Sequence, residues 1–331
     1  MASEYPRRKG AVQVTDLQVR KMRFAFADYP VPFNWNPSDP AFSLATNMLS
    51  FLFLAIEKMI SATVHEALPT ITDPEVAEEA LAFVRQEGQH SMAHRQHAKG
   101  LIKAYPALQE TLDEVMAEYD ELTVSKPLNY RLAYIADLEA TFTPTFSMML
   151  NNADTLFAPG DDRVASLFLW HFVEEIEHRS SALIIYDAVV ADPWYRMRLA
   201  PEVFQHGGAV MVKAANSFNR LIPLEERKVD ATSIFGSELW KSTLVKQFPF
   251  LQKYRLFAMS ENGPTYRIYS QIPLREQFAV AFGVMCSQIP GHKPAKAKMP
   301  ALAKEWLARY DAGYDVTRWY TAANNDQASQ G

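Results

Sequence analysis

Residues 170–178 read WHFVEEIEH, the most informative stretch of this chain. It places His171, Glu175 and His178 at positions i, i+4 and i+7. At about 100° per helical residue, these side chains fall within roughly 60° of arc on one helix face. Charged side chains are rarely buried on such a stripe unless they are paired or bind a metal. Two imidazoles and a carboxylate at this spacing therefore indicate a metal-ligand set.

A second cluster repeats the Glu-x-x-His spacing of Glu175 and His178. It consists of Glu87 and His90, in the stretch QEGQH at residues 86–90. A ferritin-like di-metal bundle takes one Glu from each of two helices and one Glu-x-x-His pair from each of the other two. The two remaining carboxylates are therefore expected on helices that precede each pair.

Two isolated glutamates meet that expectation. Glu57 lies in FLFLAIEKMI, residues 51–60, and Glu139 lies in YIADLEATFTP, residues 134–144. An ionised, unpaired Glu on an apolar helix face is costly, and a metal partner removes that cost. The sequence thus predicts an all-α protein, a ferritin-like four-helix bundle with additional C-terminal helices. The predicted metal ligands, of which the four glutamates would also serve catalysis, are Glu57, Glu87, His90, Glu139, His171, Glu175 and His178.

The composition is consistent with a helical protein that encloses such a site. The chain has 331 residues, of which 48% are hydrophobic and only 12 are Gly, which favours one large helical domain with additions. The single cysteine excludes an intramolecular disulfide framework, and no signal peptide is evident, so a cytoplasmic location is expected. The net charge of −5 gives no electrostatic case for nucleic-acid binding. The most apolar window, residues 42–64, contains Glu57 and Lys58 and is interpreted as a buried helix rather than a membrane span.

Proline and capping signals divide the chain into four parts. Residues 1–40 are expected to form an irregular arm because four prolines between positions 30 and 40 deny it a long helix. The di-metal bundle is assigned to residues 41–192, a C-terminal helical region packed on the bundle to 193–320, and a flexible tail to 321–331. Helices are expected over about residues 41–67, 74–105, 162–190 and 200–222. A shorter helix is expected to end near residue 122, and a further helix to begin near residue 127.

Several polar residues near the ligands have more than one interpretation. His171 is either a third histidine ligand or a group that caps the cluster by bonding a ligand. His94, seven residues after Glu87, is a further ligand, an outer partner of a ligand, a proton relay or an ordinary core histidine. Glu174, like Glu177, points away from Glu175 and is either solvated or an outer partner of a ligand. His65 and His97 are interpreted as ordinary polar-face residues.

Aromatic residues flank the ligand positions. Phe53, Phe142 and Phe146 are candidates for lining a substrate pocket that suits an apolar or aromatic molecule, with plain core packing as the alternative. Thr143 has two interpretations. Its hydroxyl lies near the site where oxygen would bind, or it forms a hydrogen bond to the backbone of its own helix beside Pro144.

The motifs resemble known families. WH-x-x-EEIEH at residues 170–178, with QE-x-x-H-x-x-x-H at residues 86–94, resembles the bacterial family described as predicted metal-dependent hydrolases, over about residues 20–200. The ligand pattern is also similar to that of the non-haem di-iron arylamine N-oxygenases, which use four Glu and three His. Carried over by motif, the resemblance implies the same seven ligands and an oxygenase that N-oxygenates or hydroxylates a small substrate.

Three functions remain as hypotheses. The first is a di-iron oxygenase holding two Fe ions, with O2 as co-substrate and an external electron donor such as a reductase or ferredoxin. The second is a di-metal hydrolase, because carboxylate and imidazole sites also accept Mn or Zn. The third is a ferritin-like iron-handling protein. The expected partners are a small-molecule substrate and, as a candidate assembly, a second copy of the chain. No nucleic-acid partner and no membrane span are expected.

Overall fold

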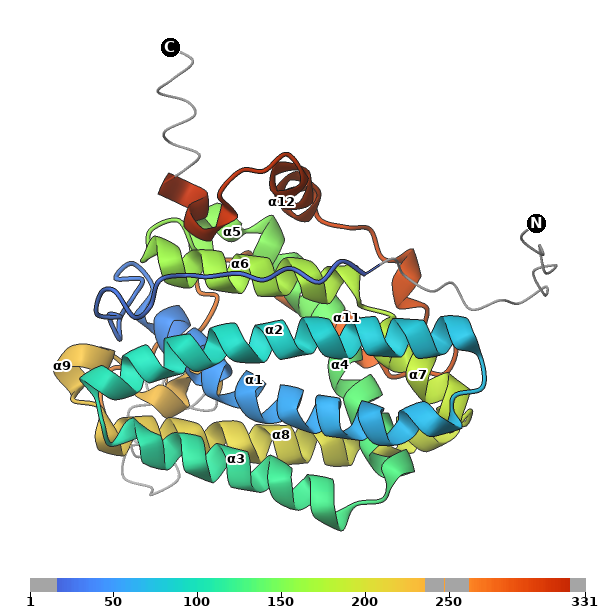
Figure 1. The fold of residues 1–331 in the computed structure, drawn as a ribbon. Helices are drawn as coiled ribbons and strands as arrows, with labels where there is room; N and C mark the ends of the chain where they lie inside the picture. The colour runs from blue at the N-terminus through green and yellow to red at the C-terminus, as the bar shows by residue number, and fades with distance from the viewer. Residues whose placement is uncertain (1–16, 236–246, 248–261, 322–331) are drawn as a thin grey trace.

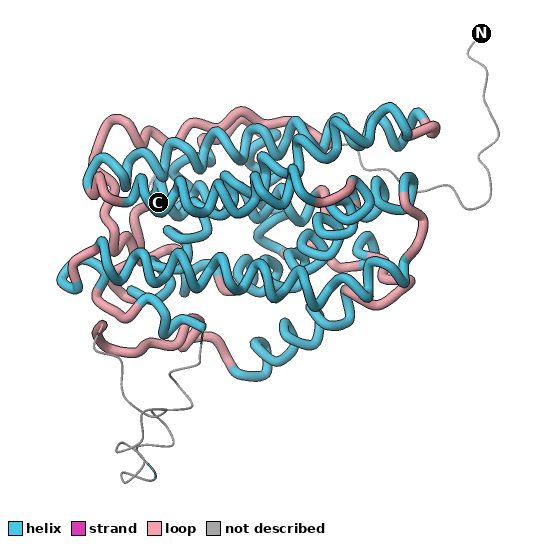
Figure 2. The backbone as a smooth tube through the Cα atoms, turned by 90° about the horizontal axis from the view of Figure 1, so that it is seen from below, coloured by secondary structure: helices cyan, strands magenta, loops and turns pink. Residues whose placement is uncertain are grey.

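The computed structural model describes residues 17–235, 247 and 262–321. All regular elements in this part of the chain are helical, which confirms the all-α prediction (Figures 1 and 2). The α-helices are α1 (Pro40–Ala67), α2 (Pro74–Ala104), α3 (Leu108–Ser125), α4 (Leu128–Asn151), α5 (Ala153–Leu156), α6 (Asp162–Glu177), α7 (Ser181–Val189), α8 (Pro193–Leu221), α9 (Leu224–Arg227), α11 (Leu274–Ser287) and α12 (Ala301–Asp311). Short 3-10 turns are η1 (Leu68–Thr70), η2 (Ala231–Phe235), η5 (Pro294–Lys296) and η6 (Val316–Arg318).

The three longest helices begin with the same local signal. Each has an Asp at the cap position followed by Pro at the first helical position, at Asp39, Asp73 and Asp192. The Asp carboxylate accepts hydrogen bonds from backbone N–H groups of the first turn that have no partner inside the helix. Proline fits there because it has no N–H to leave unpaired and its φ is already helical. These caps set where α1, α2 and α8 start.

Two predicted helix boundaries are wrong. The helix expected over residues 162–190 is two helices, because α6 ends at Glu177 and α7 begins at Ser181. The Arg179 guanidinium donates to the carbonyl of Ile176, at the end of α6, and to that of Pro294, so the last turn is closed by a side chain. Helix α8 begins at Pro193 rather than residue 200, as its Asp-Pro cap dictates.

Helices α1, α2, α4 and α6 surround the interior. Helix α1 packs against α2 and α3, whereas α4 packs against α6, α7, α8 and α11. Figure 1 shows α1, α2, α3 and α8 running side by side, with α6 above them and α4 behind. Helix α1 with η1 is long and apolar enough to cross a membrane by length and composition, but 72% of its most apolar window is buried inside the protein.

The described part of the N-terminal arm, residues 17–39, contains no helix and lies across the bundle (Figure 1). Its aromatic side chains Phe24, Phe33 and Trp35 are buried. The Trp35 indole N–H donates to Thr46 Oγ1 on α1 at 2.8 Å, so the arm is bonded to the bundle as well as packed on it. The expected beginning of the arm, residues 1–16, and the expected tail from residue 322 lie outside the described residues.

Candidate metal centre

All seven sequence-predicted ligands meet in the interior between four helices. Helix α1 contributes Glu57, α2 contributes Glu87 and His90, α4 contributes Glu139, and α6 contributes the remaining residues His171, Glu175 and, at its C-terminal cap, His178. None of these residues is exposed by more than 4%. The structure therefore brings together residues that are separated by more than 100 positions in the chain.

One group of ligand atoms surrounds His178. Its Nε2 atom lies 3.0 Å from Glu175 Oε2, 3.3 Å from Glu87 Oε1 and 3.7 Å from Glu139 Oε2. One ligand atom from each of these four residues lies within 4.8 Å of the others. Three carboxylates and an imidazole so arranged match the donor set of a divalent transition metal.

A second group lies beside the first and shares residues with it. His90 Nδ1 lies 3.8 Å from Glu87 Oε2 and 3.7 Å from Glu175 Oε1. His171 Nε2 lies 2.8 Å from Glu175 Oε1 and 3.9 Å from Glu57 Oε1. Within the described residues, Glu87 and Glu175 each belong to two of four overlapping ligand sets, which indicates a site for two metals; one of the four sets joins Glu57 and His171 to His94.

Each histidine points one ring nitrogen into the cluster and binds an outer partner with the other. The outer contacts are His90 Nε2 to Glu174 Oε2 at 2.8 Å, His171 Nδ1 to His94 Nε2 at 2.7 Å, and His178 Nδ1 to Gln86 Oε1 at 3.0 Å. Such bonds fix the tautomer and ring orientation of a metal-binding histidine. Glu174 and His94 thus lie where outer partners of ligands belong. The sequence reasoning missed Gln86, although it directly precedes Glu87.

A buried arginine from the N-terminal arm supports this outer layer. Arg20 Nη1 donates to Glu174 Oε1 at 2.9 Å and to Glu177 Oε2 at 2.7 Å, and Nη2 donates to Glu177 Oε1 at 3.0 Å. Its guanidinium also lies over the rings of Trp306 and Tyr310 on α12, 5.9 and 5.3 Å from the centroids. No sequence pattern signalled Arg20, because its partners are 154 and 157 positions away.

The prediction for His97 is wrong. It was expected on a polar face, but its side chain is fully buried. The arm covers this part of α2, and the Phe26 ring lies 5.1 Å from the His97 ring. Ser50 Oγ on α1 joins the two α2 histidines, at 2.9 Å from His94 Nδ1 and 2.8 Å from His97 Nδ1. His65, in contrast, is exposed as predicted.

Several buried polar atoms in the cluster make no hydrogen bond. Both carboxylate oxygens of Glu57, Oε1 of Glu87, Oε1 of Glu139 and Nδ1 of His90 are buried and make no hydrogen bond within the described part of the chain. Buried polar atoms are nearly always paired, so a group of orphans in one place requires an explanation. A divalent cation provides one, because these oxygen and nitrogen atoms are all ligand atoms. The residues present therefore fit two metal ions.

Electrostatics lead to the same conclusion. Burial, together with repulsion from Glu87 and Glu175, raises the pKa of Glu57 well above its usual range. Burial and the charges of Glu175 and Glu87 likewise raise the pKa of Glu139. Burial alone would raise the pKa of Glu175, but His178 and His171 outweigh it and hold it well below the usual value. Carboxylates this close repel one another, and a bound divalent cation reverses that repulsion.

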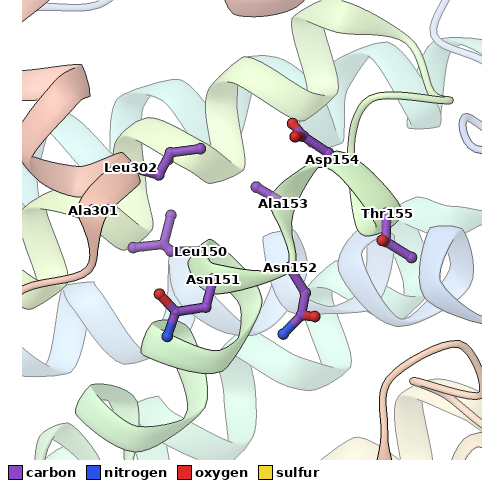
Figure 3. A pocket seen from close by; sticks show the side chains of 8 residues that line it. All are labelled: Leu150, Asn151, Asn152, Ala153, Asp154, Thr155, Ala301 and Leu302. Carbon is purple, nitrogen blue, oxygen red and sulfur yellow. The ribbon is translucent and has the colours of Figure 1, made fainter.

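An apolar cavity of about 270 Å³ adjoins the cluster. All three candidate pocket residues line it, namely Phe53, Phe142 and Phe146, and the remaining lining residues are Ala45, Leu49, Thr141, Thr145, Met149, Met211, Ile234, Ile268 and Tyr269. The Phe53 ring separates the cavity from the ligands and lies 4.4 Å from the His171 ring. A second cavity of about 390 Å³ lies between α4, α5 and the start of α12 (Figure 3). It is lined by none of the candidate site residues.

Thr143 lies one helical turn after Glu139 on α4. Its hydroxyl is buried and has no hydrogen-bond partner among the described residues. Its neighbours Thr141 and Thr145 instead donate to backbone carbonyls of their own helix. The alternative interpretation of Thr143, a bond to its own helix backbone, therefore does not describe it.

The fold and site define a class: an all-helical protein with a buried carboxylate–histidine centre for two metals. The profile of the family described as "predicted metal-dependent hydrolase" matches residues 18–253. This is most of the chain, and the protein belongs to that family. No significant match is found among curated proteins or among solved structures.

Proposed function

We propose that the protein is a ferritin-like, non-haem di-iron oxygenase that N-oxygenates or hydroxylates a small apolar or aromatic substrate. The observation that carries the proposal is the pair of ligand groups sharing Glu87 and Glu175, with an apolar aromatic cavity beside it. Helices α1, α2, α4 and α6 each supply ligands, as in di-iron carboxylate bundles. Two irons bound here would supply O2 reduction and oxygen transfer, with electrons from a reductase or ferredoxin.

The protein's own contribution is charge, orientation and exclusion of water. Four buried carboxylates, Glu57, Glu87, Glu139 and Glu175, favour highly charged metals, and oxygens of the first three have no hydrogen-bond donor among the described residues. His90, His171 and His178 are held by their outer partners. Because every ligand is at least 96% buried, bulk water is kept from the centre.

His171 makes the two metal positions unequal. The group around His178 has one imidazole and three carboxylates, whereas the adjacent group has the imidazoles of both His90 and His171. Neutral nitrogen donors stabilise an oxidised metal less than anionic carboxylates do. The position near His171 is also the one that faces the Phe53 ring and the cavity. We infer that substrate approaches from that side.

The cavity suits a small aromatic molecule. Its lining within the described residues carries no charged side chain, so binding a charged ligand there would cost desolvation energy without compensation. Phe53 packs edge-on against Phe142 and Phe146, and these rings offer the same contacts to an aromatic substrate. Thr143 places an unpaired hydroxyl on the same helix, where it would donate or accept a hydrogen bond near the reacting atom.

A di-metal hydrolase is the second candidate, supported by the description of the family. Hydrolysis requires a Lewis-acidic metal with a position open to water. The burial of all four carboxylates and the apolar cavity favour oxygen chemistry over delivery of water.

The deciding experiment is elemental analysis and Mössbauer spectroscopy of purified protein, followed by reduction and exposure to O2. Two antiferromagnetically coupled irons per chain and rapid O2 consumption are expected. Glu87→Gln should lose both properties, whereas Glu78→Gln, an exposed glutamate on the same helix, should keep them. Stoichiometric zinc with ester or amide cleavage under anaerobic conditions would establish the hydrolase instead. Mineral accumulation far beyond two irons per chain would indicate iron storage.

A further inference from the structure

Helix α11 exposes a continuous apolar stripe. Leu274 is 54% exposed, Phe278 71%, Phe282 69%, Met285 71% and, just beyond the helix end, Ile289 52%. The sequence from Phe278 to Gln288 contains no charged residue. Monomeric proteins rarely leave large apolar side chains grouped in this way, and such a patch usually marks an interaction site.

The opposite face of α11 is firmly attached to the bundle, so the stripe is not a loosely docked end. Gly283 lies against Pro144 of α4, where an added Cβ atom would come within 2.9 Å of the proline Cβ. Asn152 Nδ2 donates to Glu276 Oε2 at 2.9 Å, and Gln288 Nε2 donates to the Asp137 carbonyl at 3.2 Å. The helix is thereby fixed in one rotation against α4, and the stripe residues remain exposed.

The stripe is nearly symmetric about its own midpoint, which lies between Ala281 and Phe282. Leu274 and Ile289 are equally far from this point, and so are Phe278 and Met285. An antiparallel copy of the helix, related by a twofold axis through the midpoint, would therefore set each large side chain against another. Such a self-complementary patch is what a twofold interface requires.

We propose that this stripe is the dimer interface, and that its occupant is α11 of a second copy of the chain. The spacing of the five residues, four, four, three and four, is that of a helix-pairing seam. The five side chains present on the order of 600 Å² of apolar surface, taking roughly 200 Å² for a large side chain. Two copies would bury about 1,200 Å², which exceeds the roughly 1,000 Å² that a specific interface needs.

The electrostatics at the helix ends fit this arrangement. In the antiparallel pair, exposed Arg275 at the N-terminal end of one α11 lies beside the C-terminal turn of the other. That turn carries the negative end of the helix dipole, so the cation is favourably placed. The central aromatic residue, Phe282, lies next to the twofold axis and would be the residue on which the dimer depends most.

Sedimentation velocity of the full-length protein tests the proposal. The chain has a mass of 37.5 kDa, and a dimer of about twice that mass is expected. Phe282→Glu should weaken the dimer by roughly 100-fold. Phe204→Glu, at an exposed Phe on α8, should leave it intact. A monomeric wild type, or a dimer unaffected by Phe282→Glu, overturns the proposal.

Crosslinking provides a second readout that does not depend on how well the glutamate variant folds. In a Cys286→Ala background, Phe282→Cys should be joined to its own copy by a short bismaleimide, because the axis passes next to it. Leu274→Cys alone should not crosslink, since the same residue of the second copy lies at the far end of the paired helix. Crosslinking at both positions or at neither contradicts the antiparallel pairing. A monomer that pellets with anionic lipid vesicles would assign the stripe to a membrane surface instead.

Discussion

Arg20 is the most informative residue to remove, because its effect on stability is distinguishable from that of an ordinary ion pair. Its side chain is only 3% exposed and bonds two carboxylates, Glu174 and Glu177, while Trp306 and Tyr310 cover its guanidinium. In Arg20→Ala both carboxylates stay in the protein without their cation. Breaking a buried pair in this way costs about 3–5 kcal/mol, because the remaining charge keeps its desolvation penalty.

The centre should also change, through His90. Glu174 accepts a hydrogen bond from His90 Nε2 at 2.8 Å with one oxygen, and Arg20 holds its other oxygen at 2.9 Å, so that removing Arg20 frees this acceptor to move. Losing the outer partner of a metal-binding histidine typically costs 10- to 100-fold in metal affinity, or about 1.4–2.8 kcal/mol. Arg20→Lys should be intermediate, because Lys keeps the charge but cannot donate a fork of parallel bonds.

Guanidinium unfolding of the metal-free protein measures the first effect, and anaerobic titration with ferrous or manganous ion measures the second. Arg220→Ala is the matched control. Arg220 donates to Glu110 at 2.6 Å, but both side chains are 54% exposed, so less than about 1 kcal/mol is expected and no change in metal affinity. Equal losses of stability for the two variants, or unchanged metal affinity in Arg20→Ala, would show that Arg20 has no special role in the core.

Three further results are expected. Glu175→Ala, at a shared carboxylate, should abolish binding of both metals, whereas Glu139→Ala, which belongs to a single ligand group, should leave one metal per chain by elemental analysis. Burial alone would raise the pKa of Asp161, but Arg163 outweighs it and holds that pKa below its usual value. Asp161→Asn should therefore cost about 1–2 kcal/mol at pH 7 in denaturant unfolding, and the difference should shrink as the pH falls through the folded pKa; a difference that does not change as the pH is lowered would contradict this. Chelation of bound metal should lower the thermal midpoint, since the orphaned ligand atoms lose their partner; an unchanged midpoint in calorimetry would count against a metal in the core.

The cluster of seven predicted ligand residues could be anticipated from sequence because each residue is marked locally. Glu57 and Glu139 stand out within apolar helices, and the pairs Glu87–His90 and Glu175–His178 repeat one spacing. The helical periodicity of each segment then places its ligand on the buried face, without knowledge of any distant contact. Most helix boundaries follow from caps in the same local way.

What the sequence could not predict depends on contacts between distant segments. The break after His178 is closed by Arg179 bonding a carbonyl near residue 294, and the burial of His97 depends on an arm residue, Phe26. Arg20 has no neighbour in sequence that marks it as important. These features have no periodic signature, because their partners are chosen by the tertiary fold.

The charge balance of the core explains why the outer layer needs an arginine. Four carboxylates facing two divalent cations sum to zero, so the inner cluster is neutral once loaded. Glu174, directly behind His90, adds a negative charge that is fully buried. Without a cation this buried charge would be left unpaired, which is costly. Arg20 pairs with it at 2.9 Å, and Trp306 and Tyr310 cover the guanidinium. The arm and α12 therefore act on the metal centre through one buried charge, although neither supplies a ligand.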